Sequence, residues 1–370
     1  MEFQYCMPTR VVCGADNIEK LDALFPAGAI LIVADPIMAK IGVTERVQKI
    51  LGSRKTEVFT EVEPNPSFET ADRAAALARG IDAVGVVGIG GGSSLDVAKA
   101  ASMLCTNEGS IEDYIVGGKK LENKRCFLIC VPTTAGTGSE VSNVGVFTDH
   151  KAHTKRPWVS FDFLPDIALL DPVMTYSLPP RVTVATGLDA LCHAVESYWC
   201  RATNPITKSA AIMSAKLVLE NLMTAFNEPK NVEARTNMCV ASLLGGLAMG
   251  QTRMTACHGI SYGLTTNFGI DHGTACALTL PEMIRLFYPA VKDEMDTLVK
   301  MIGCESAEDF ACRVEGMMDT AGIHRNLSAY GIKESDLPEL AHLGMIAPVT
   351  ANSPMDLTEA DVYEALRNIL

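Results

Sequence analysis

Strand-like apolar runs alternate with helical patterns through the first half of this 370-residue chain. The strand-like runs cover residues 29–34, 57–59, 83–88 and 126–131, and the helical patterns cover residues 36–51, 68–79 and the stretch that ends at residue 104. Apolar strands that alternate with helices are typical of a parallel sheet covered by helices on both faces. The first half of the chain therefore predicts an α/β fold.

The pattern changes near residues 178–180. Beyond this point the chain is rich in Ala, Leu and Met, and its apolar residues recur at helical spacing. The helices predicted there cover residues 186–199, 204–226, 232–248, 254–265 and 274–287, with further helices toward the C-terminus. We therefore predict an α/β domain over residues 1–179 and an all-helical domain over residues 180–370.

The chain has 44 Asp and Glu residues against 31 Lys and Arg, a formal net charge of −13. This charge argues against nucleic acid or an anionic membrane as a partner, although a small anionic substrate needs only one or two local cations. The sequence starts without an apolar signal segment, and no apolar run is long enough to span a membrane. The twelve cysteines include no CxxC pair, so we expect reduced thiols in a cytoplasmic protein.

A glycine-rich turn, GIGGGSSLDVA, covers residues 88–98 between a predicted strand and a predicted helix. Backbone N–H groups in such a turn approach a phosphate closely, and the helix N-terminus adds partial positive charge. Ser93 or Ser94 is suited to cap the helix, but Ser93 also breaks the GxGxxG dinucleotide motif. The alternative is a tight turn without a ligand. The glycines that leave room for a phosphate are Gly90, Gly91 and Gly92.

A second loop, PTTAGTGSE, follows the next predicted strand at residues 132–140. Two such loops after neighbouring parallel strands are suited to hold a pyrophosphate at the carboxyl edge of the sheet, although a capped turn is the alternative. Asp35 ends the first strong strand, where a carboxylate accepts a hydrogen bond from a ribose hydroxyl and repels a 2′-phosphate. This favours NAD over NADP, unless Asp35 only forms the turn before Pro36.

The helical half contains a possible metal site. Asp189 and His193 are four residues apart, so a helix places both on one face, although a structural Asp–His contact is the alternative. His258 and His272 are about 21 Å apart on a straight helix and meet only if the chain turns between them. Residues 267–271, NFGID, are suited to form that turn. One Asp and three His ligands suit Fe(II), Zn(II) or Mn(II).

The ordered motifs GGGSSLD, PTTAGTGSE, TGLDALCHA and H-x13-HG resemble the iron-containing, group III metal-dependent alcohol dehydrogenases over nearly the whole chain. The resemblance implies an N-terminal Rossmann-like domain that binds NAD(H), a C-terminal helical domain that binds the metal and the substrate, and an active site in the cleft. It further implies these roles. The metal ligands are Asp189, His193, His258 and His272. The pyrophosphate loop comprises Gly91, Gly92, Ser93 and Asp96, and the second cofactor segment comprises Thr133, Thr134 and Thr137. Lys155 approaches the cofactor ribose, and Asp35 matches the residue associated with NAD preference.

Two positions depart from the family pattern. Tyr262 stands where many relatives have a second helix-borne histidine that contacts the substrate, and 4-hydroxybutyrate dehydrogenases also have Tyr there. Tyr262 either orients a substrate or is a neutral replacement. Arg253 stands where relatives usually have Gly in a helix of small residues. Arg253 either binds an anionic group or forms a structural salt bridge or subunit contact, and on an ideal helix it lies about 140° from the His258 ligand face.

Within this family, the sequence resembles the subgroup of 4-hydroxybutyrate dehydrogenases and of sulfoacetaldehyde or phosphonoacetaldehyde reductases. We therefore expect a homodimeric enzyme that uses NADH and a divalent metal, Fe(II) or Zn(II), to reduce a short aldehyde with an anionic tail, with contributions from Tyr262, Lys155 and Arg253. The alternatives are a general small-alcohol or diol dehydrogenase of the same family and a lyase similar to dehydroquinate synthase. A non-catalytic assembly protein is disfavoured by the four potential ligands. The lyase is disfavoured because no Lys/Arg cluster surrounds residues 189–196 or 257–272.

Overall fold

The computed structural model describes residues 2–152 and 154–370, which divide into two compact units. The α/β unit comprises Met7–Thr134 and Ser139–Thr175. The helical unit comprises residues 2–6, Ala135–Gly138 and Tyr176–Leu370. The helical unit resumes four residues before the predicted boundary at 179/180. It also takes four residues from the second predicted loop, which a single cut in the sequence does not anticipate.

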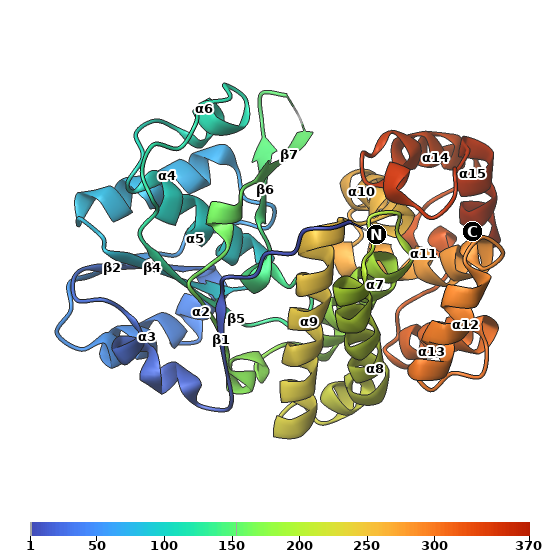
Figure 1. The fold of residues 1–370 in the computed structure, drawn as a ribbon, viewed down its shortest axis with the longest axis horizontal. Helices are drawn as coiled ribbons and strands as arrows, with labels where there is room; N and C mark the ends of the chain where they lie inside the picture. Colours follow the sequence, from blue (N-terminus) through green and yellow to red (C-terminus); the bar gives the residue numbers. More distant parts are fainter. Residues whose placement is uncertain (1, 153) are drawn as a thin grey trace. The chain divides into compact units, whose positions relative to one another are not determined.

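The α/β unit is built on a six-stranded parallel sheet in the order β1-β8-β5-β4-β2-β3 (Figure 1). Its strands are β1 (Arg10–Cys13), β2 (Ile30–Ala34), β3 (Thr56–Phe59), β4 (Gly85–Gly90), β5 (Phe127–Pro132) and β8 (Ile167–Leu170). Along β2, Ile30 and Ile32 pack into one apolar cluster while Leu31 and Val33 pack into another. Because alternate side chains of a strand point to opposite faces, both faces of this sheet are covered. The predicted parallel sheet is confirmed.

Helices pack on both faces of this sheet. Figure 1 shows α4 and α5 on one side and α3 on the other. The helices are α1 (Leu21–Leu24), α2 (Pro36–Lys40), α3 (Val43–Leu51), α4 (Phe68–Gly80), α5 (Gly92–Leu104) and α6 (Ile111–Ile115). The prediction of one continuous helix over residues 36–51 is wrong. The helix is interrupted at Gly42, which has a left-handed φ of +80°, a conformation that glycine adopts without strain.

A hairpin for which we predicted no element follows the second loop. Strands β6 (Val144–Asp149) and β7 (Thr154–Val159) pair antiparallel as a separate two-stranded sheet. Trp158 of β7 stacks on Tyr114 with ring centroids 5.4 Å apart, which ties the hairpin to α6. The hairpin matters for function because it contains Lys155.

The helical unit is built around α7 (Pro180–Trp199), which is buried from Leu188 onward. This helix packs against α8 (Pro205–Asn227), α9 (Val232–Thr252) and α11 (His272–Phe287). The remaining helices are α10 (Ala256–Phe268), α12 (Lys292–Met301), α13 (Ala307–Thr320), α14 (Leu337–Ile346) and α15 (Glu359–Asn368). Within the described residues, no helix combines the length and apolarity needed to cross a membrane. The predicted combination of an α/β part and an all-helical part is confirmed.

Candidate active site

Three helices of the helical unit bring the four predicted metal ligands together. Helix α7 presents Asp189 and His193 one turn apart, and His258 and His272 come from α10 and α11. The predicted turn between α10 and α11 is confirmed. Helix α10 ends at Gly269, which has a left-handed φ of +68°, and α11 starts at His272.

The three histidines surround a single carboxylate oxygen. Their Nε2 atoms lie 3.9 Å (His193), 3.5 Å (His258) and 3.8 Å (His272) from Asp189 Oδ1. Ligand atoms bound tetrahedrally to one ion at about 2.1 Å lie about 3.4 Å apart. The ligand atoms of Asp189, His258 and His272 lie within 4.8 Å of one another, which is close to this spacing, and His193 adjoins them through Asp189. Both Asp189 Oδ1 and His258 Nε2 are buried and have no hydrogen-bond partner. Because unpartnered buried polar atoms are costly, this donor set fits a divalent metal ion.

Hydrogen bonds on the far side of two imidazoles hold their rings in position. His193 Nδ1 donates to Gly136 O at 3.1 Å, and His258 Nδ1 donates to Glu196 Oε2. Each bond keeps the proton on Nδ1 and leaves Nε2 directed toward Asp189, as is usual for histidine ligands. Glu196 is itself held by the backbone N–H of Cys257, at 2.8 Å from Oε1.

Sequence analysis missed Glu196, Gly136 and Cys276. Glu196 lies seven residues after Asp189 on the same helix face, so its spacing was a readable signal. Cys276 lies one turn after His272, and its Sγ is 3.8 Å from His272 Nε2. Its sulfur lies within 4.8 Å of the ligand atoms of Asp189, His258 and His272. No local pattern pointed to the carbonyl of Gly136.

The charged side chains of this group shift one another's pKa values. Burial alone raises the pKa of the Asp189 carboxyl, but the imidazoles, His193 foremost, hold that pKa below its usual range. Burial lowers the pKa of His258, but Cys276 and Glu196 together raise it well above its ordinary value. Because a metal binds the neutral imidazole, the raised pKa of His258 means that cation binding competes with protonation of this ring.

The two predicted cofactor loops meet at the carboxyl edge of the sheet. Strands β4 and β5 pair so that Gly90 lies opposite Pro132, and Thr133 N donates to Gly90 O at 3.0 Å. A methyl group at Gly91 would lie 3.5 Å from the side chain of Thr134. Thr134 Oγ1 is buried with no hydrogen-bond partner. An orphaned hydroxyl beside the N-terminus of α5 fits a bound phosphate.

Gly90 leaves no room for a side chain. Gly90 has a φ of +150°, and a methyl group there would lie 2.4 Å from Ser94 Oγ and 3.1 Å from Asp35 Oδ2. The prediction that Ser93 or Ser94 caps the helix is wrong, because Gly91 is the N-cap and α5 starts at Gly92. Ser93 Oγ instead accepts a hydrogen bond from Asn65 N at 3.2 Å.

Asp35 and Lys155 both lie beside this loop. Asp35 Oδ1 caps α2 by accepting from Ile37 N at 2.8 Å, so Asp35 forms the turn before the helix, while its Oδ2 faces Gly90. Lys155 Nζ donates to Asn65 Oδ1 at 2.8 Å, and burial lowers the pKa of Lys155. Asn65 therefore links Lys155 to Ser93. Sequence analysis missed Asn65, although the turn-forming PNPS segment was a possible signal.

Two other predicted cofactor residues have structural partners of their own. Asp96 accepts from Ser139 Oγ at 2.8 Å and from Val146 N at 2.9 Å, so it ties α5 to the start of the hairpin. Thr137 belongs to the helical unit, in the segment Ala135–Gly138. The glycine loop, in contrast, belongs to the α/β unit. The cofactor-binding roles of Asp96 and Thr137 stay predictions.

Tyr262 lies within a helix of the helical unit, whereas Arg253 lies just after the end of another. Tyr262 lies one turn after His258 on α10 and is 39% exposed. Desolvation raises the pKa of its hydroxyl, so Tyr262 stays protonated at neutral pH. Arg253 follows the end of α9 with a left-handed φ of 65°, and its Nη1 donates to Gly250 O at 3.0 Å. The expectation that Arg253 lies within a helix is wrong, so its angle to His258 on a helical wheel has no meaning.

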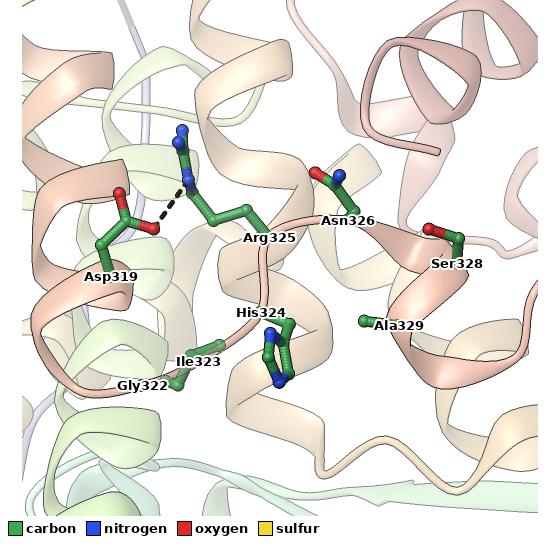
Figure 2. Close-up of a pocket in the computed structure, with 8 residues that line it drawn as sticks. All are labelled: Asp319, Gly322, Ile323, His324, Arg325, Asn326, Ser328 and Ala329. Carbon is green, nitrogen blue, oxygen red and sulfur yellow. Dashed lines mark hydrogen bonds and ion pairs between the residues drawn. The ribbon is translucent and has the colours of Figure 1, made fainter.

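A hollow elsewhere in the helical unit contains none of the predicted site residues (Figure 2). Its lining runs from Asp319 in α13 to Ala329. Arg325 in this lining is already paired with Asp319 at 2.9 Å and with Glu315 at 2.7 Å. Its charge is therefore neutralised within the chain.

The glycine loop at the carboxyl edge of a parallel sheet fits a dinucleotide phosphate, and the buried Asp–His group fits a divalent metal, a combination expected of a metal-dependent oxidoreductase. The chain belongs to the iron-containing alcohol dehydrogenase family. The model for iron-containing alcohol dehydrogenase matches residues 8–172, and the model for the C-terminal part of the Fe-containing alcohol dehydrogenase family matches residues 183–370. The predictions of the family and of an oxidoreductase are confirmed.

Individual relatives match along most of their length. Long-chain-alcohol dehydrogenase 1 of Geobacillus thermodenitrificans is 35% identical over 93% of this chain and 92% of its own. Sulfoacetaldehyde reductase of Bilophila wadsworthia is 35% identical over 90% of this chain and 89% of its own. The solved structure of sulfoacetaldehyde reductase from Bifidobacterium kashiwanohense, in complex with NAD+, has a TM-score of 0.95 at 33% identity and covers 100% of this chain and 99% of its own. The predicted cofactors, a divalent metal and NAD(H), agree with these matches and with the Asp–His group.

Proposed function

We propose that this enzyme uses NADH and a divalent metal to reduce a short aldehyde with an anionic tail to its alcohol. The observation that carries the proposal is Tyr262, a protonated phenol one turn after His258 in the metal-binding group. A group that stays protonated donates a hydrogen bond to an anionic substrate instead of removing a proton. The similarity to two sulfoacetaldehyde reductases supports an anionic tail.

The residues of the chain have distinct tasks in this reaction. Asp189, His193, His258 and His272 hold the metal, with Glu196 and Gly136 orienting two of the rings. When bound, the metal supplies Lewis-acid polarisation of the aldehyde oxygen and NADH supplies the hydride. The α5 N-terminus and Thr134 hold the pyrophosphate, and Asp35 favours NADH over NADPH by repelling a 2′-phosphate.

The anionic tail needs a cation. Lys155 and Arg253 are the candidates in our proposal. Burial lowers the pKa of both side chains, and a partly buried cation gains more from an anionic ligand than a solvated one does. Lys155 also stands beside the glycine loop through Asn65, so a change at Lys155 is expected to affect NADH binding as well.

The test is an NADH-oxidation assay with Fe(II)- or Zn(II)-reconstituted protein. Succinate semialdehyde, sulfoacetaldehyde and phosphonoacetaldehyde are compared with butanal and a long-chain aldehyde. We expect kcat/KM at least about tenfold higher for one anionic aldehyde than for butanal, a difference of about 1.4 kcal/mol. Tyr262→Phe, which removes only the hydroxyl, should reduce that preference. Equal rates with anionic and neutral aldehydes would refute the proposal.

A second candidate is a general or long-chain alcohol dehydrogenase. It is favoured by the equal identity, 35%, to the long-chain-alcohol dehydrogenase of Geobacillus thermodenitrificans. In this case Tyr262 only shapes the pocket, and Tyr262→Phe leaves the order of substrates unchanged. The same assay separates the two candidates. A homodimeric state and a cytoplasmic location stay predictions, and sedimentation analysis tests the first.

A further inference from the structure

Two thiols meet in the α/β unit where α5 ends and β5 begins. Cys105 is the C-cap of α5, and Cys126 immediately precedes β5. The Cys105 and Cys126 thiols are near enough to shift each other's pKa. The Cys105 thiol donates to Ser102 O at 3.2 Å, and Cys126 N donates to the same carbonyl at 3.1 Å. Cys105 Sγ and Cys126 N therefore lie at the same backbone carbonyl, which places the two cysteines side by side.

The two sulfurs have different surroundings. Cys126 is 8% exposed and belongs to the apolar cluster on one face of the sheet, against which the half-buried Cys105 packs. Arg79 of α4 donates to Leu104 O at 2.6 Å, which places its positive charge beside Cys105. The neighbouring Cys126 thiol, followed by smaller effects that include Arg79, lowers the pKa of Cys105, whereas the pKa of Cys126 is raised. Cys105 is thus the accessible nucleophile and Cys126 the buried partner.

We propose that Cys105 and Cys126 form a reversible disulfide when the protein meets a peroxide. The Cys105 thiolate attacks one peroxide oxygen, a sulfur–oxygen bond forms as the oxygen–oxygen bond breaks, and water leaves. The sulfur of Cys126 then attacks the sulfenic sulfur, the disulfide forms as the sulfur–oxygen bond breaks, and a second water leaves. The two thiols lose two electrons and two protons, and the peroxide is reduced to two waters.

The disulfide would join two elements of the cofactor-binding unit. Helix α5 starts at the glycine loop, and β5 leads to Thr133 and Thr134. The crosslink lies at the opposite end of both elements and closes the segment of residues 106–125, which contains α6. It uses no metal ligand and does not depend on the substrate, so it stands apart from the proposed function.

Peptide mapping of the full-length protein tests the proposal. Reduced protein is treated with hydrogen peroxide, alkylated under denaturing conditions and digested with trypsin. Cleavage at the basic residues between the two cysteines places Cys105 in peptide 100–119 and Cys126 in peptide 126–151. We expect these peptides to be joined, with the loss of two hydrogens, and to separate after treatment with a dithiol reductant.

Peptide 126–151 also contains Cys130, which provides a matched control. Cys130 is fully buried in β5, and burial raises its pKa to about 12. The crosslink should persist in Cys130→Ala and disappear in Cys126→Ala and Cys105→Ala. The peptide map of the oxidised wild-type protein tests the disulfide even if a variant fails to fold. Oxidation of Cys105 beyond the sulfenic acid while Cys126 remains open to alkylation overturns the proposal, and so does a crosslink that needs Cys130.

Discussion

Glu140 of the second loop is a buried acid without a hydrogen-bonding partner for its carboxylate oxygens. It is 1% exposed, and both oxygens are unpartnered. Lys99 lies nearby, but its Nζ already donates to Ser139 Oγ at 2.7 Å, Ser142 Oγ at 3.1 Å and Val144 O at 3.0 Å. Burial raises the pKa of Glu140 to about 7, against an ordinary value of 4.5. We predict that Glu140→Gln makes the stability of the protein less sensitive to pH.

The sign follows from proton linkage. Below about pH 4.5 the carboxyl is protonated in both the folded and the unfolded chain, and Glu140 carries no charge penalty. As the pH rises from 4.5 to 7, the unfolded chain loses this proton first, so the free energy of unfolding falls. At 1.36 kcal/mol per pH unit, the full penalty above pH 7 is roughly 3 kcal/mol. Gln has no charge to desolvate, so the free energy of unfolding of the Glu140→Gln variant does not fall with pH for this reason.

The assay is the thermal unfolding midpoint of wild type and Glu140→Gln between pH 5 and pH 8. Relative to wild type, the variant should become more stable by roughly 2–3 kcal/mol over this interval, or roughly 3–4 °C in midpoint for a chain of this length. Any cost of burying the amide is the same at each pH and cancels in this comparison. Glu57→Gln, at an exposed position of β3, should follow wild type. If the Glu140→Gln and wild-type curves run parallel, the carboxylate is not penalised and the reasoning is wrong.

Three further predictions concern the two sites. Glu196→Gln should lower metal affinity about 10–100-fold, because the His258 ring loses its charged support; chelator competition measures this, and unchanged affinity would contradict it. Metal affinity should rise from pH 6 to pH 8, because binding displaces the proton that the raised pKa of His258 retains; a flat profile in dye competition would refute this. Gly90→Ala should weaken NADH binding, measured by fluorescence, with metal content unchanged, because its methyl group would meet Ser94 Oγ at 2.4 Å.

Local patterns in the sequence were enough to predict the layered architecture and the helices that carry the candidate metal ligands. The continuous apolar run of β2 predicted a strand buried on both faces. In the structure, each face of this strand packs into a separate apolar cluster. The four-residue spacing of Asp189 and His193 placed them on one helix face, as the structure shows. The NFGID segment predicted the turn that lets His258 and His272 meet. Each of these inferences rests on residues close together in the chain.

Contacts between segments far apart in the chain could be identified only from the tertiary structure. Gly136 orients His193, Asn65 links Lys155 to the glycine loop, and Asp96 ties α5 to a hairpin that no pattern predicted. The break at Gly42 and the end of α9 before Arg253 also overrode the helical spacing. Sequence periodicity therefore determined which faces are buried and which side chains share a helix. Only the tertiary structure decided which backbone carbonyls and distant side chains satisfy the buried polar groups, because that choice depends on the packing of elements far apart in the chain.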